Sequence, residues 1–193
     1  MIIHISGPSG SGKTYLGSRL KDKYKNAITV CDIDDLRQAF IKWFYVGKPF
    51  KKINSVAYQK YIDTYISKHC DKPLVFVGLN VMPWWHDIYY DLHADHKFYI
   101  KIDYKKVLLQ RYGRIMQDLL DDDKSLHSNM LIKDNPKFLK NVANWFAYDL
   151  SLKQLTKDSD KFATNYKAQN YTFASSDLIF NTVCKLLNNE LKK

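Results

Sequence analysis

Eight residues near the start of the chain, with the sequence GPSGSGKT, have the types and spacing of a loop that binds phosphate. Gly7 and Gly12 are separated by four residues, and Lys13 and Thr14 follow directly. Glycine lets backbone N–H groups turn toward phosphate oxygens, the lysine reaches the β- and γ-phosphates, and the threonine hydroxyl is a Mg²⁺ ligand. The alternative is a glycine-rich turn without a ligand. We expect the segment to bind ATP with Mg²⁺ through Gly7, Ser9, Gly10, Ser11, Gly12, Lys13 and Thr14, with Ser9 and Ser11 acting through their backbone.

A second group of reactive side chains, three carboxylates and an arginine, occurs in the sequence CDIDDLRQAF. Like charges this close repel, so a cation or a proton must relieve them. We expect Asp34 to orient an acceptor hydroxyl and take its proton, and Asp32 to hold Mg²⁺ directly or through water. Asp35 is assigned to the same acceptor site, where Arg37 can grip an anionic group. Helix capping, the structural alternative, would account for one of the three carboxylates.

Two arginines, Arg111 and Arg114, are three residues apart and therefore share one face of a helix. Phosphoryl transfer needs cationic donors where charge spreads over the transferring group. We expect both arginines to act as catalytic cations in a lid. The alternative is a pair of arginines that face solvent.

The sequence VFVGLN contains Gly78 and Asn80, at a point where many ATPases carry an aspartate for Mg²⁺. The missing acid argues against a motor or a related ATPase, which also needs a partner glutamate. Gly78 can allow close approach of a substrate, and Asn80 can donate a hydrogen bond to one. A turn residue is the alternative reading of Asn80.

Alternating strands and helices must position these residues. Short apolar runs predict strands at 2–6, 27–31, 73–79, 97–102 and 171–173. Apolar residues at helical spacing predict helices at 13–24, after Asp35, from Ser55, after Asp103, behind Pro136, and from Ser175 or Ser176. The alternation predicts an α/β fold in which helices cover both faces of a parallel sheet. Ligands bind at the carboxyl ends of such strands, where the candidate residues fall.

The composition fits one domain of residues 1–193 that handles anionic molecules. The formal charge is +10, which suits nucleotides, nucleic acid or phosphorylated metabolites, although evenly spread lysines also fit a merely soluble protein. The three cysteines have no metal spacing, and no leader or apolar stretch of membrane-spanning length is evident. We therefore expect a cytoplasmic protein without a membrane partner, either a monomer or a homodimer.

Together these motifs resemble the P-loop nucleoside and nucleotide kinase superfamily, which includes adenylate kinase-like enzymes. The resemblance covers nearly the whole chain: the loop at Gly7, the acids at 32–35, the strand ending at Gly78, and the arginine pair. It implies a three-layer fold with a five-stranded parallel sheet in the order 2-3-1-4-5. It also implies acceptor-side helices at about 36–70 and a helical lid at about 112–140, and it places adenine near TFASS.

The stretch DIDDLRQAF is similar to a motif of phage-type polynucleotide 5′-kinases. That resemblance implies that Asp34 activates a 5′-hydroxyl and that Arg37 holds the 3′-phosphate of the acceptor. The aspartate of that family's third strand is missing here, where the chain reads VGLN.

Three functions therefore remain open. The first is a kinase that moves the γ-phosphate of ATP to a small acceptor, a nucleoside or a nucleoside monophosphate. The second is a polynucleotide 5′-hydroxyl kinase, whose partner would be the 5′ end of a nucleic acid. The third is a nucleotide-binding switch without transfer activity, which would have no need of Asp34.

Overall fold

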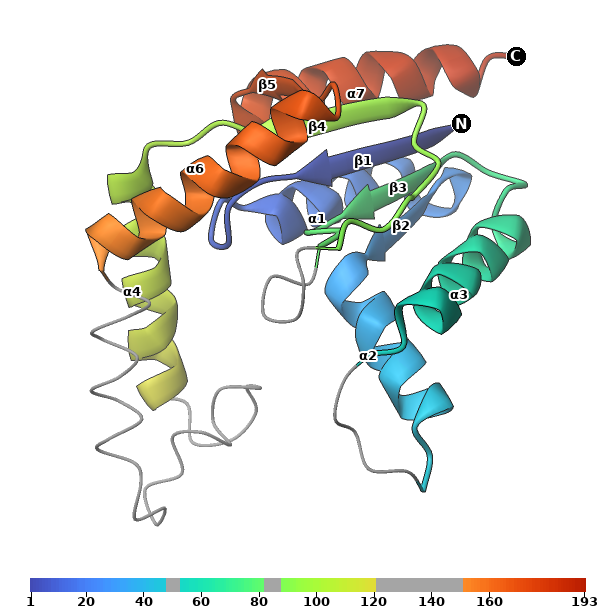
Figure 1. The fold of residues 1–193 in the computed structure, drawn as a ribbon. Helices are drawn as coiled ribbons and strands as arrows, with labels where there is room; N and C mark the ends of the chain where they lie inside the picture. The colour runs from blue at the N-terminus through green and yellow to red at the C-terminus, as the bar shows by residue number, and fades with distance from the viewer. Residues whose placement is uncertain (48–52, 82–87, 121–150) are drawn as a thin grey trace. The chain divides into compact units, whose positions relative to one another are not determined.

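The computed structural model describes residues 1–47, 53–81, 88–120 and 151–193, except for the side chains of 114–120 and 154 (Figure 1). The chain divides into two compact units. The first comprises Met1–Gly7, Gly12–Lys101 and Lys167–Lys193, and contains the sheet. The second comprises Pro8–Ser11 and Ile102–Tyr166.

Five parallel strands form the sheet of the first unit, in the predicted order β2-β3-β1-β4-β5 (Figure 1). They are β1 (Ile2–Ser6), β2 (Thr29–Asp32), β3 (Leu74–Val77), β4 (His96–Ile100) and β5 (Thr172–Ala174). The central strand β1 pairs with β3 and β4, and the carboxyl end of β1 leads directly into the glycine-rich loop. The fold is therefore α/β, as the alternation of elements predicted.

Helices α1 (Lys13–Tyr24) and α7 (Ser176–Glu190) pack against each other and cover one face of this sheet. Gly17 lies where α1 meets the strands: a Cβ there would lie 3.2 Å from the Val77 methyl carbons and 3.4 Å from that of Val30. The missing side chain thus allows α1 to approach the strands closely.

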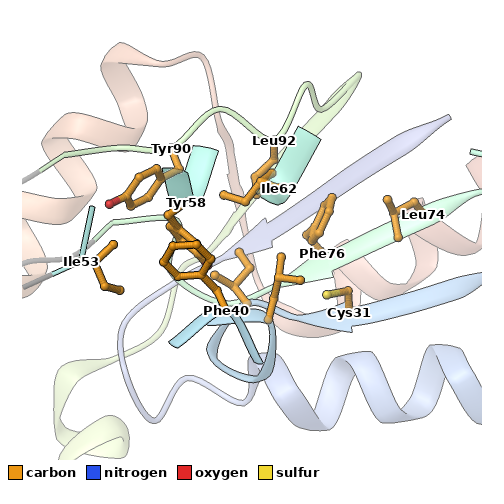
Figure 2. Close-up of a cluster of buried hydrophobic side chains, with 11 residues drawn as sticks. Cys31, Phe40, Ile53, Tyr58, Ile62, Leu74, Phe76, Tyr90 and Leu92 are labelled. Carbon is orange, nitrogen blue, oxygen red and sulfur yellow. The ribbon is translucent and has the colours of Figure 1, made fainter. Parts of the chain in front are cut away.

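The opposite face is covered by α2 (Ile33–Phe44) and α3 (Ser55–Lys68). Figure 2 shows the cluster of buried side chains there. Within this cluster, Phe40 of α2 contacts Tyr58 of α3, with 5.1 Å between the ring centroids. The face of α3 that carries Tyr58, Tyr61 and Tyr65 thus packs into this cluster. The cluster consists of Cys31, Ile33, Leu36, Phe40, Ile53, Tyr58, Ile62, Leu74, Phe76, Tyr90 and Leu92.

The second unit contains α4 (Tyr104–Leu120) and most of α6 (Leu152–Ala168). The last two residues of α6 belong to the first unit. The Tyr104 hydroxyl on α4 donates to the Asp160 carboxylate on α6, at 2.7 Å. α4 follows Asp103 as predicted, and Asp103 caps it, with Oδ1 accepting from the amide of Lys105 at 2.9 Å. The predicted helix behind Pro136 and all but the first part of the predicted lid at 112–140 lie outside the described residues.

Several boundaries differ from the predictions by a few residues, among them the starts of α2, β2 and β3, and α6 was not predicted at all. α3 begins at Ser55 as predicted, and its cap is Asn54, whose side chain accepts from the amide of Ala57 at 3.0 Å. A short 3-10 helix, Lys25–Ala27, replaces the start of the predicted second strand. β3 begins at Leu74 rather than at Pro73, because proline has no N–H for the ladder. No helix within the described ranges has the length and apolar character needed to cross a membrane.

Candidate functional site

The glycine-rich loop ends at the amino terminus of α1, where Gly12 is the N-cap with φ 85°. Glycine is favoured at this position because of the left-handed backbone conformation. Steric crowding does not require glycine there, since a Cβ would meet no atom within 4 Å. No side chain caps the helix at this position. Because the first N–H groups of a helix and its dipole attract anions, this end of α1 suits a phosphate group.

Lys13, the first residue of α1, is half-buried, and its ammonium donates to the carbonyl of Gly7 at 2.9 Å. The bond joins the two ends of the loop and places the cation beside it. A phosphate oxygen is a stronger acceptor for an ammonium than a neutral carbonyl, since both partners are then charged. Lys13 is thus in position to bind a phosphate at the loop.

Thr14 and Asp32 come from different elements and are hydrogen-bonded, with the threonine hydroxyl donating to Oδ2 of Asp32 at 3.0 Å. The other carboxylate oxygen accepts from the amide of Asp34 at 2.9 Å and thereby caps α2. Burial raises the pKa of Asp32, while these two hydrogen bonds oppose the rise. One carboxylate therefore connects the first turns of α1 and α2.

This pair of oxygen donors fits Mg²⁺, which prefers hydroxyl, carboxylate and water oxygens. Within the described residues, no three histidine, cysteine or acidic side chains come together as a complete metal site. An ion held by Thr14 and Asp32 would take its remaining ligands from phosphate and water, as is usual for Mg²⁺ bound with a nucleotide.

Asp34 and Arg37 form an ion pair on the first turns of α2, with 2.7 Å between Oδ1 and Nη1. The Asp34 side chain is 72% exposed, whereas the Arg37 side chain is only 17% exposed. Nη2 of Arg37 donates to the carbonyl of Leu79 at 3.1 Å, and its Nε is buried without a partner in the described structure. The backbone of Leu79 thus holds the guanidinium of Arg37, which in turn binds the exposed carboxylate of Asp34. Asp35 is exposed beside them, and its charge contributes to the raised pKa of Asp32.

Gly78 directly follows β3 and has φ 133°, which disfavours other residues. A Cβ there would lie 3.0 Å from the Cβ of Ile33, so the close neighbour of Gly78 is the first residue of α2. Asn80 is buried, and its amide nitrogen donates to the carbonyl of Tyr90 at 2.7 Å. Both residues thus have structural roles, and substrate binding by them stays a prediction.

Arg111 contacts the middle of the loop within the second unit, where its Nε donates to the carbonyl of Ser9 at 3.1 Å. A Cβ at Gly10 would lie 3.2 Å from Cγ of Arg111, so α4 supports the loop closely. Ser11 is buried, and its amide donates to the carbonyl of Pro8 at 3.0 Å. Arg114 lies on α4, but its side chain is outside the described part of the structure.

The interaction that sequence reasoning missed involves His4, in the middle of β1. His4 is fully buried. Its ring nitrogens lie 2.5 Å from the hydroxyl of Tyr171 and 3.0 Å from the carbonyl of Gly78. A polar residue within the apolar run IIHIS was the only available signal, and it did not identify the partners.

The comparisons with known proteins returned no match, either to a model of a protein family or to a curated protein. The functional interpretation of the site therefore rests on its geometry and on the sequence motifs.

Proposed function

We propose that the protein is a P-loop kinase that transfers the γ-phosphate of ATP to a small acceptor, a nucleoside or a nucleoside monophosphate. The observation that carries the proposal is the position of Asp32. Its carboxylate accepts from the Thr14 hydroxyl at the end of the loop and from the amide of Asp34. Asp34 lies in the acidic turn, which is formed by residues 32–35. The residues assigned to the phosphate donor and to the acceptor therefore share one carboxylate.

In this proposal Thr14 and Asp32 hold Mg²⁺, which neutralises charge on the β- and γ-phosphates when it is bound. The loop amides and the amino terminus of α1 bind the phosphates. Lys13 exchanges its bond to the Gly7 carbonyl for one to the nucleotide. Arg111 and Arg114 supply further positive charge to the transferring group, and Arg111 also supports the loop through Ser9.

Asp34 receives the acceptor in this proposal. Its carboxylate is mostly exposed, and Arg37 holds one oxygen, which leaves the group oriented toward an incoming hydroxyl. A carboxylate in this position can accept the hydroxyl proton as the oxygen attacks the γ-phosphorus, while the bond from the γ-phosphorus to the bridging oxygen breaks and ADP leaves. A hydroxyl acceptor makes fuller use of Asp34 than a phosphate acceptor, which needs no base.

A polynucleotide with a 5′-hydroxyl is the second candidate acceptor. The Asp34–Arg37 pair and the formal charge of +10 favour it. Against it, Arg37 is bonded to Asp34 and Leu79, so a phosphate of the acceptor would have to compete for the same guanidinium.

The test is transfer of labelled γ-phosphate from ATP to nucleosides, nucleoside monophosphates and a 5′-hydroxyl oligonucleotide. We expect labelling of a small acceptor and its loss in Lys13→Ala, by about a hundredfold or more, because a charged donor to the phosphates is removed. Lys21→Ala, an exposed change on the same helix, is the matched control. Labelling of the oligonucleotide alone would select the second candidate, and full turnover by Lys13→Ala would contradict the loop assignment.

A further inference from the structure

His4 makes two hydrogen bonds that fix its tautomer. The carbonyl of Gly78 can only accept, so Nε2 of the imidazole carries the proton and donates, at 3.0 Å. Nδ1 is then the acceptor, and the hydroxyl of Tyr171 donates to it at 2.5 Å. Burial lowers the pKa of His4 to about 4, which keeps the ring neutral at pH 7. The ring thereby joins β1 to the end of β3 and to the residue that precedes β5.

Gly78 begins a segment of three residues, each held by a different part of the first unit. The carbonyl of Gly78 accepts from His4 on β1, and the carbonyl of Leu79 accepts from Arg37 on α2. Asn80 exchanges two hydrogen bonds with Tyr90, at 2.8 Å through its carbonyl and 2.7 Å through its side chain. The path of residues 78–80 therefore decides where Arg37 is held.

Arg37 in turn holds Asp34, at 2.7 Å. Tyr171 and Asp34 are thus connected by the hydrogen bonds of His4 and of Arg37, and the backbone from the Gly78 carbonyl to the Leu79 carbonyl links these two sets. A buried leucine would fill the position of His4 without the desolvation of a polar ring, so packing alone does not require a histidine there.

We infer that His4 and Tyr171 are positioning residues for the acceptor site, which set the orientation of Asp34 through the Gly78–Leu79 segment and Arg37. The inference rests on the proposed function in one respect, namely that Asp34 receives the acceptor. Neither residue touches a reacting atom. A contiguous series of bonds establishes coupling only when both ends respond together, which is what the experiment measures.

The first experiment compares Tyr171→Phe with Tyr24→Phe. Tyr24 lies on α1, and its hydroxyl bonds to the carbonyl of Cys184 at 3.0 Å and to Asn188 at 2.8 Å, away from the acidic turn. We expect Tyr171→Phe to raise the KM for the acceptor about fivefold and the KM for ATP by less than about twofold. Tyr24→Phe should change neither. An equal rise in both KM values, or no rise, would overturn the inference.

The second experiment uses His4→Gln and His4→Leu. Glutamine keeps a donor and an acceptor, whereas leucine suits a buried apolar site better. Positioning predicts that His4→Gln retains more acceptor affinity than His4→Leu. A role in packing alone predicts the reverse order, and that result would reject the inference.

A third readout does not depend on turnover. Hydrogen exchange of peptides covering 78–80 and 33–37 should accelerate in Tyr171→Phe and stay unchanged in Tyr24→Phe. If the unaltered protein transfers no phosphate, the proposed function fails, and this measurement still decides the coupling. If transfer occurs but these peptides exchange as in the unaltered protein, the coupling is wrong while the proposed function stands.

Discussion

The hydroxyl of Thr14 donates to the carboxylate of Asp32 at 3.0 Å, and this bond joins the glycine-rich loop to the acidic turn. The two residues are on different elements, α1 and the end of β2. Because Asp32 also caps α2 through the amide of Asp34, any shift of α1 relative to α2 must break or remake a bond to this one carboxylate. The proposed metal site and the proposed acceptor site therefore both depend on the position of the Asp32 carboxylate.

Asp32→Asn should weaken the Mg²⁺-dependent part of ATP binding by about tenfold or more, because a neutral amide is a poor ligand for Mg²⁺. Asparagine is itself a good N-cap, so the start of α2 should survive. Calorimetric titration with ATP, with and without Mg²⁺, measures the effect. Asp22→Asn, an exposed change on α1, is the control and should have no effect. Unchanged affinity of Asp32→Asn for the magnesium nucleotide would remove Asp32 from the metal site.

Gly78→Ala should lower the free energy of unfolding by at least about 2 kcal/mol. The new methyl would have to adopt φ 133° and would meet the Cβ of Ile33 at 3.0 Å. Gly47→Ala is the matched control, since its φ is also positive at 67° but nothing lies within 4 Å. It should lose only about 1 kcal/mol. Denaturant unfolding measures both, and equal losses would mean that contact with Ile33 is unimportant.

Tyr58→Phe should stabilise the protein by about 1 kcal/mol. The Tyr58 side chain is fully buried, and its hydroxyl has no hydrogen-bond partner in the described structure. Removing an unsatisfied buried group removes its desolvation penalty. Tyr171→Phe should instead destabilise by about 1 kcal/mol, because its hydroxyl is bonded to His4. Thermal unfolding compares the two variants. A loss in both would indicate that a buried water satisfies Tyr58.

His4 should make stability depend on pH between about 4 and 6.5. The pKa of His4 is about 4 in the folded protein and 6.5 in an ordinary environment. Between these values the unfolded chain binds more protons, so stability falls as the pH drops. His4→Gln lacks this proton uptake, and its deficit relative to the unaltered protein should therefore be smaller at pH 5 than at pH 7. Denaturant unfolding at both pH values checks this. A deficit of His4→Gln that is independent of pH would mean that His4 titrates normally.

Local patterns were sufficient to predict the elements around the loop, whereas the strand order was implied by the resemblance to the P-loop kinase superfamily. The run of residues 2–6, the glycines and Lys13 fall where a strand, a turn and a helix must follow one another. Ends of elements were less predictable, because they depend on partners elsewhere. β2 begins at Thr29, because this residue pairs with Leu74 on β3. β3 itself begins at Leu74, because Pro73 has no N–H to donate to the ladder. Helix α6 was missed, since its sequence is rich in polar residues with only a few buried apolar ones.

Within the site, sequence reasoning placed Asp32, Asp34 and Arg37 at one strand end but did not give their partners. Arg37 was expected to grip an acceptor, which stays a prediction, and the structure shows that it is bonded to Asp34 and to Leu79. His4 and Tyr171 are 167 residues apart. Such contacts depend on the register of the whole sheet, and no local pattern encodes them.

Phosphoryl transfer by Asp34→Asn, measured with labelled ATP and the best small acceptor, tests the proposed role of Asp34 in catalysis. Asparagine fills the same space but cannot take a proton. We expect transfer to fall by at least about a hundredfold, while the Kd for ATP stays within about twofold of the unaltered protein. Full transfer by Asp34→Asn, or no transfer by the unaltered protein to any acceptor, would contradict this role.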